Sequence, residues 1–221
     1  MNYYFFCQHA PMVRNQTKLI FEKYKQAIRQ SDIVKAGKHL EQLKAIAPAK
    51  GWYHQGLFWP FVSKKNNTWV VHKQINAFKR SLRFNTKNAA AWRALGNSLF
   101  RLKKYTEAER AYKKSFASSK SRLYKNDALR FLADIALQQG KKTNALQLLK
   151  RVLKSKYRPP YIQLAPHFIA YYQKTNNQKR VNYWANKGLV STKIIAKSGK
   201  QAYGPPDTYK KIEQYFQNFI R

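Results

Sequence analysis

Pairs of adjacent basic residues are the clearest candidates for functional side chains in this sequence. They recur as Lys79–Arg80, Lys113–Lys114 and Lys150–Arg151, and two of the pairs are followed by a further basic residue, Arg83 or Lys154. Lysine and arginine bind phosphate and carboxylate groups by charge and hydrogen bonding, without reading a base sequence. The pattern therefore predicts binding of an anionic partner.

The charge of the whole chain points the same way. The 221 residues include 44 Lys and Arg against 9 Asp and Glu, which gives a net charge of +35. No acidic residue lies between Glu41 and Glu107, or between Asp134 and Asp207. Self-repulsion of this kind destabilises a compact chain unless an anionic partner offsets it.

Catalytic motifs, by contrast, are not found in the sequence. The histidines are isolated, and no Gly-rich phosphate loop, His-Glu-x-x-His pair or nucleophile elbow is present. The 9 carboxylates also leave few residues for metal-assisted hydrolysis. We therefore expect no enzyme activity, no cofactor and no metal site.

Helical elements must hold the basic pairs in place. In residues 89–116, apolar side chains recur every three or four residues on one helical face, a turn follows, and a second apolar stripe begins. The first stripe holds Trp92, Leu95, Leu99 and Leu102, and the second holds Ala108, Ala111, Tyr112 and Phe116. This spacing predicts an antiparallel helix pair.

These two helices resemble a tetratricopeptide repeat. Trp92, Leu95, Gly96 and Ala108 match the family pattern, and Tyr112 replaces its phenylalanine. Looser copies put the equivalent of Ala108 at positions 36, 74, 145 and 181. With Ala108 included, the five positions are separated by 38, 34, 37 and 36 residues. The family period is about 34 residues. The resemblance implies an all-α fold, a right-handed solenoid of helix pairs with about four to five repeats.

The loose copies extend over residues 17–189, which we expect to be the helical-repeat domain. Residues 1–16 are expected to be an N-terminal extension, 190–206 a linker, and 207–221 a final helix that caps the stack. Residues 51–65 are dense in aromatic residues and contain Pro60, so we expect a short or kinked helix there. Its Trp52 and Tyr53 are open to two uses, stacking on unpaired bases or packing in the core.

The resemblance also implies where the basic residues lie, because the second helix of each repeat is on the convex face. The basic pairs would form a ladder there, and a second basic set falls at the turns. The residues expected to bind nucleic acid on this basis are Lys79, Arg80, Arg83, Lys103, Lys104, Lys113, Lys114, Lys141, Lys142, Lys150, Arg151 and Lys154. The alternative is that these positions are basic only for solubility.

The concave groove of the family usually holds a peptide, and four first-helix residues are expected to face it: Arg93, Asn97, Arg101 and Arg130. Arg93 and Asn97 are similar to half of the clamp with which some family members hold the carboxylates of an acidic peptide. Phe131 and His167 stand where the other half needs polar or basic groups. A groove for a different acidic or amphipathic segment is therefore expected.

Two functions fit these observations. The first is a non-catalytic scaffold that docks electrostatically onto an anionic assembly, RNA or a ribonucleoprotein such as the ribosome. The alternative is a protein–protein adaptor that binds an acidic peptide in its groove. Attachment to an anionic membrane surface is disfavoured, because the sequence has no amphipathic anchor, lipidation motif or apolar run of membrane-spanning length. The single cysteine, Cys7, and the acid-free N-terminus lead us to expect the cytoplasm or, alternatively, a mitochondrial or other organelle matrix.

Overall fold

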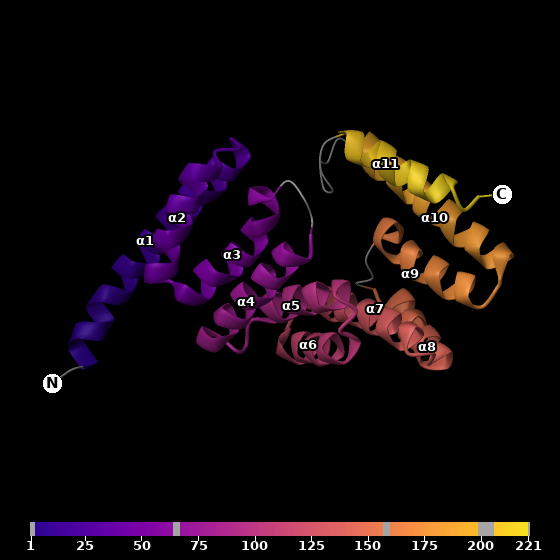
Figure 1. Ribbon diagram of the computed structural model, residues 1–221, viewed down its shortest axis with the longest axis horizontal. Coiled ribbons are helices and arrows are strands. Elements are labelled where there is room, and N and C mark those ends of the chain that lie inside the picture. The colour runs from indigo at the N-terminus through magenta and orange to yellow at the C-terminus, as the bar shows by residue number, and fades with distance from the viewer. Residues whose placement is uncertain (1–2, 64–66, 157–159, 199–205, 221) are drawn as a thin grey trace. The chain divides into compact units, whose positions relative to one another are not determined.

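The computed structural model describes residues 3–63, 67–156, 160–198 and 206–220, with side chains from residue 12 onward except that of Pro206. Every regular element in these ranges is a helix (Figure 1). The helices are α1 (Tyr3–Arg29), α2 (Ile33–Ile46), α3 (Pro48–Val62), α4 (Thr68–Phe84), α5 (Ala89–Arg101), α6 (Tyr105–Ser118), α7 (Arg122–Gln138), α8 (Lys142–Lys154), α9 (Tyr161–Lys174), α10 (Gln178–Lys197) and α11 (Pro206–Gln217). They form two compact units, Met1–Ser118 and Ser119–Arg221.

In the first unit the helices pack as the pairs α1–α2, α3–α4 and α5–α6, and successive pairs meet through α2–α3 and α4–α5 contacts. The apolar residues Ala36, Leu40 and Leu43 recur at helical spacing along one face of α2 and are fully buried. They pack with Tyr24 of α1 and Phe58 of α3. A single stripe on α2 therefore joins its own pair to the next one.

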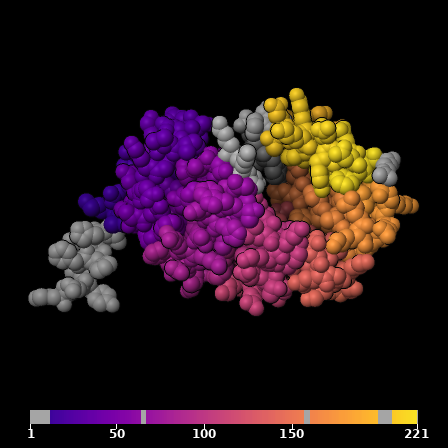
Figure 2. All heavy atoms as spheres, viewed as in Figure 1, coloured from indigo at the N-terminus to yellow at the C-terminus, as the bar shows by residue number. Residues whose placement is uncertain are grey.

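The second unit holds the pairs α7–α8 and α9–α10, and α9 contacts both helices of the preceding pair. The last helix, α11, packs on α10, and their side chains adjoin in the space-filling view (Figure 2). At the crossing, a Cβ atom on Gly188 would lie 2.3 Å from the ring of Phe216, which is buried. The missing side chain at Gly188 therefore lets α11 close against α10, and the expected capping helix is confirmed.

The turns inside the pairs α1–α2, α5–α6, α7–α8 and α9–α10 share one geometry. Ser31, Lys103, Gly140 and Asn176 have positive φ angles, between 53° and 79°. After each of them, a backbone N–H reaches back to a carbonyl of the preceding helix, as from Lys104 to Leu99 at 3.0 Å and from Lys141 to Ala136 at 2.8 Å. This is the Schellman closure of a helix C-terminus. Its recurrence shows that the looser repeats follow the same plan as the clear one.

Gly96 and Tyr112, which carry the sequence resemblance, contact each other across the α5–α6 pair. A Cβ atom on Gly96 would lie 2.9 Å from the Tyr112 ring. Tyr112 is fully buried, and its hydroxyl donates a hydrogen bond to the side-chain oxygen of Asn97 at 2.6 Å. The close approach expected from the small residue at position 96 is present.

The segments differ in four respects from those expected from the sequence. Residues 190–197 are the last turns of α10 rather than part of a linker, because Gly199 is the first helix breaker after Gly188 and Thr192 is buried. Residues 3–16 of the expected N-terminal extension belong to α1. Residues 51–62 of the aromatic segment lie in α3, a helix of 15 residues with Pro60 in its last turn, and residues 64–65 lie outside the described residues. The range 17–189 is divided between the two units.

Candidate functional site

All twelve basic residues expected to bind nucleic acid are exposed. In the first unit, α4 carries Lys79, Arg80 and Arg83, and α6 carries Lys113 and Lys114. Lys103 and Lys104 lie in the turn between α5 and α6. The remaining five residues, on α8 and the α7–α8 turn, belong to the second unit. Among them, Lys113 pairs with Glu109 at 2.7 Å and Lys104 with Glu107 at 3.8 Å. The expected role of these residues in nucleic-acid binding stays a prediction.

Three of the four expected groove residues share one face of α5. Arg93, Asn97 and Arg101 are spaced four residues apart, so they lie on successive turns, away from the buried stripe of Leu95 and Leu99. The Asn97 side-chain oxygen accepts the Tyr112 hydroxyl, which leaves its amide nitrogen to donate. Helix α5 contains no acidic residue. We call Arg93, Asn97 and Arg101 the α5 face.

Arg101 is oriented by a residue of the neighbouring pair. Its guanidinium donates to the side-chain oxygen of Gln74 on α4 at 3.2 Å. The Gln74 amide nitrogen in turn donates to the backbone carbonyl of Gly56 on α3 at 3.2 Å. The exposed end of the α5 face is therefore tied through a buried glutamine to the backbone of α3.

Arg130 differs from the expectation, because it is only 8% exposed and its guanidinium is engaged within the second unit. It donates to the backbone carbonyl of Gln163 at 2.8 Å and pairs with Asp127 at 3.2 Å. Next to it, His167 contacts the Asp134 carboxylate at 2.7 Å. These contacts tie α7 to α9. Arg130 therefore joins α7 to α9 within the second unit, and its expected role in peptide binding stays a prediction.

Part of the aromatic segment 51–62 packs within the first unit, whereas Phe61 and Val62 are exposed. His54 lies beside Phe21 and Tyr24, with ring centroids 4.6 and 5.6 Å away, and Tyr53 lies beside Phe78 at 6.0 Å. Burial, reinforced by the positive charges of Lys50 and Lys25, lowers the pKa of His54 from 6.5 to about 4. His54 is therefore neutral at neutral pH and belongs to an aromatic cluster between α1 and α3.

Residues 87–157, which span α5 to α8, match the family model of the tetratricopeptide repeat. This part of the chain carries tetratricopeptide repeats. No curated protein sequence matches it.

Solved structures share the repeat fold at low sequence identity. The MamA protein is 16% identical with a TM-score of 0.59, covering 86% of this chain and 98% of its own. PilW, described as a widely conserved type IV pilus biogenesis factor, is 14% identical with a TM-score of 0.65, covering 91% and 90%. PilF of Pseudomonas aeruginosa is 12% identical with a TM-score of 0.64, covering 92% and 90%. These likenesses confirm the all-α, helix-pair fold of the tetratricopeptide solenoids.

The repeats reveal a structural use for some basic residues that the sequence analysis did not identify. Arg80 lies over the Trp52 ring at 4.5 Å, and Lys114 lies over the Trp92 ring at 4.4 Å. A third repeat places Lys187 at 5.9 Å from Tyr161. Each of these cations lies six residues after the residue of its repeat that is equivalent to Ala108, so all three occupy the same position in the repeat. In the sequence, the feature that could have indicated these contacts is an aromatic residue near the start of the first helix of each of these three repeats. Each cation packs on the aromatic ring of its own repeat.

Within the described residues, no helix is long and apolar enough to cross a bilayer. Over the same residues, no group of His, Cys, Asp and Glu side chains is arranged to hold a metal ion.

Proposed function

We propose that the protein is a non-catalytic repeat scaffold whose α5 face binds an acidic segment of a partner protein. The supporting observation is the line of Arg93, Asn97 and Arg101 on successive turns of one acid-free helix. Two of the three side chains are already oriented by hydrogen bonds, to Tyr112 and Gln74. Donors held in place in this way lose less side-chain entropy when a ligand binds.

The spacing of these side chains suits an extended peptide. One helical turn advances about 5–6 Å, and two residues of an extended chain advance about 7 Å. Carboxylates on alternate residues of the partner would therefore meet successive donors of the α5 face. Arginine binds carboxylates through paired N–H groups, and the Asn97 amide supplies a further donor between the two arginines.

The test uses a labelled peptide with alternating aspartate and serine, titrated against the full-length protein by fluorescence anisotropy. Arg93→Glu with Arg101→Glu is expected to weaken binding roughly tenfold or more, because two attractive contacts become repulsive. The control reverses two exposed lysines of the same unit, Lys23→Glu with Lys38→Glu, which changes the net charge equally. Equal losses in the two variants would contradict a site on the α5 face.

Electrostatic docking on RNA or a ribonucleoprotein such as the ribosome is a second candidate, favoured by exposed cations that make no ion pair with the described residues. These are Lys79, Arg83, Lys103, Lys141, Lys142 and Lys154. Reversing Lys79, Lys141, Lys142 and Lys154 to Glu is expected to remove binding of single-stranded RNA at moderate salt, since each phosphate contact releases a counterion. Unchanged RNA binding by this variant would exclude these residues. For either function we propose a cytoplasmic or organelle-matrix location.

A further inference from the structure

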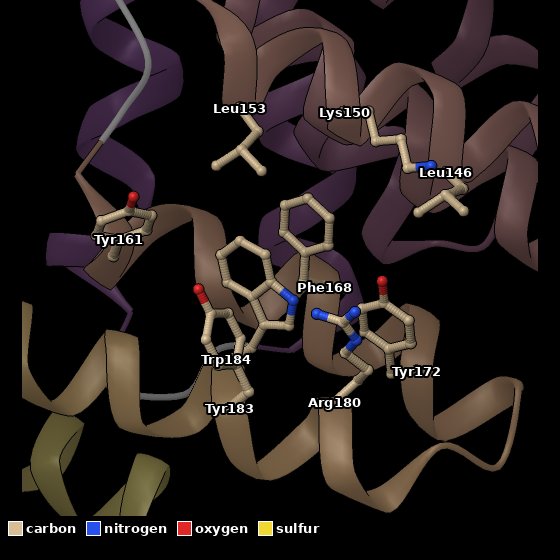
Figure 3. Close-up of a pocket in the computed structure, with 9 residues that line it drawn as sticks. All are labelled: Leu146, Lys150, Leu153, Tyr161, Phe168, Tyr172, Arg180, Tyr183 and Trp184. Carbon is tan, nitrogen blue, oxygen red and sulfur yellow. The ribbon is translucent and has the colours of Figure 1, made fainter.

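A pocket lies in the second unit, between α8, α9 and α10 (Figure 3). Its volume is about 530 Å³. Its apolar surface comes from Leu146 and Leu153 of α8 and from Phe168 and Trp184, whose rings stack at 3.9 Å. Two cations and three tyrosine hydroxyls complete the lining: Lys150, Arg180, Tyr161, Tyr172 and Tyr183. We call this the α8–α10 pocket.

The first unit contains an equivalent pocket of about 340 Å³, between α2, α3 and α4. Counting from the residues equivalent to Ala108 pairs Lys73 with Arg180 and Ala77 with Trp184. The same count places Glu41 where the α8–α10 pocket has Lys150. The two pockets are thus one structural position of the repeat with different side chains, which offers a comparison within a single molecule.

The cations of the two pockets have different surroundings. In the first pocket, Lys44 pairs with Glu41 at 2.6 Å, and Lys73 lies over the Trp69 ring at 5.3 Å. In the α8–α10 pocket, Lys150 and Arg180 make no side-chain ion pair, hydrogen bond or ring contact with the described residues. No acidic residue lines that pocket among the described residues. Two uncompensated positive charges beside an apolar surface favour an anionic ligand that also has an apolar part.

The aromatic side chains indicate which kind of ligand fits. Phe168 and Trp184 are only 2% and 5% exposed and are stacked on each other, so their ring faces are not open to a nucleic-acid base. Lys187 lies over the rings of Tyr183 and Tyr161, at 5.6 and 5.9 Å. Recognition of unpaired bases depends on open ring faces. The leucine side chains and tyrosine residues of the lining suit an amino-acid side chain better.

We propose that the α8–α10 pocket binds an acidic peptide segment through one apolar anchor residue. The anchor side chain packs between the leucines of α8 and the Phe168–Trp184 stack. Carboxylates that flank it in the peptide pair with Lys150 and Arg180. The partner class is that of the proposed function, but this is a separate site on a different unit, and it does not require the α5 face.

The test compares two labelled peptides, Asp-Glu-Phe-Glu-Asp and Asp-Glu-Ala-Glu-Asp, on the full chain by fluorescence anisotropy. Burial of a phenylalanine side chain contributes about 1.5–3 kcal/mol, so the Phe peptide is expected to bind at least roughly tenfold more tightly. Arg180→Glu is expected to remove most of the Phe-peptide binding, whereas Lys73→Glu, the same charge change at the same repeat position, is expected to leave it unchanged.

Each remaining outcome decides against the proposal. Equal binding of the two peptides would exclude an apolar anchor, and equal losses in Arg180→Glu and Lys73→Glu would show an effect of net charge alone. If poly-uridine RNA displaced the Phe peptide equally well from Arg180→Glu and from Lys73→Glu, the peptide would be bound by a surface that accepts any anion and not by the α8–α10 pocket. The variant Arg93→Glu with Arg101→Glu should keep Phe-peptide binding, so failure of the proposed function and failure of this site are separable.

Discussion

Gln74 donates a hydrogen bond from its side-chain amide to the backbone carbonyl of Gly56, across the α3–α4 pair. In a regular helix this carbonyl would accept the N–H of the residue four positions on, but that residue is Pro60, which has no N–H. Most of the other repeats have alanine at the position of Gln74. The glutamine therefore satisfies a buried carbonyl that the proline leaves open, and its oxygen holds Arg101 of the α5 face.

Replacing Gln74 with alanine should therefore be costly. The change leaves the Gly56 carbonyl without this donor, and we expect the free energy of unfolding to fall by about 1–3 kcal/mol in urea titrations. Pro60→Ala restores a backbone donor, so the loss caused by Gln74→Ala should be smaller in the Pro60→Ala background. Simple additivity of the two substitutions would mean that they do not share the carbonyl.

The turn residue Lys103 offers a gain in stability. Its φ angle of 58° lies in the left-handed region, which costs a residue with a Cβ atom about 1–2 kcal/mol, and Gly140 occupies the equivalent place in the next repeat. We expect Lys103→Gly to raise the free energy of unfolding by about 0.5–1 kcal/mol, since glycine also adds freedom to the unfolded chain. Gly140→Ala should lower it. If Lys103→Gly lowered the free energy of unfolding, the lysine side chain would contribute more to stability than its left-handed backbone conformation costs.

Arg80 and Lys79 are adjacent basic residues with different surroundings. Arg80 lies over Trp52, so Arg80→Gln is expected to cost about 0.5–1 kcal/mol of stability. Lys79 is exposed and makes no ring contact with the described residues, so Lys79→Gln should change stability by less than about 0.5 kcal/mol. Thermal or chemical unfolding of the two variants measures the difference. Equal effects would contradict a structural role for the cation–ring contact.

Features that depend on contacts within one repeat can be predicted from this sequence, whereas features that depend on contacts between residues far apart in the sequence cannot. The helix pair around Trp92 was predictable, because its apolar spacing and the Gly96–Tyr112 approach are local features of one repeat. The exposure of the outer lysines followed from the same periodicity. The burial of Arg130 was not predictable, since it depends on the Gln163 carbonyl, 33 residues away. The α8–α10 pocket likewise needs three helices to be placed before Lys150 and Arg180 can be seen to share it.

Acid should weaken the first unit through His54. Between pH 6.5 and about 4 the unfolded chain binds a proton at this side chain that the folded chain does not, so the free energy of unfolding falls as the pH falls. The slope from this one group is at most about 1.4 kcal/mol per pH unit. His54→Phe keeps an aromatic ring in the cluster and should show a flatter dependence of stability on pH in this range. Parallel pH profiles for the two proteins would contradict a buried, neutral His54.

The proposal that the α5 face binds an acidic segment is tested most directly by NMR of the isotope-labelled (¹⁵N) full chain during titration with the alternating aspartate–serine peptide. The account predicts that the side-chain amide signal of Asn97 and the backbone amides of α5 shift first and saturate together. Arg93→Glu with Arg101→Glu should abolish these shifts. Shifts confined to the lysines of α4 and α6, with the Asn97 amide unmoved, would contradict it.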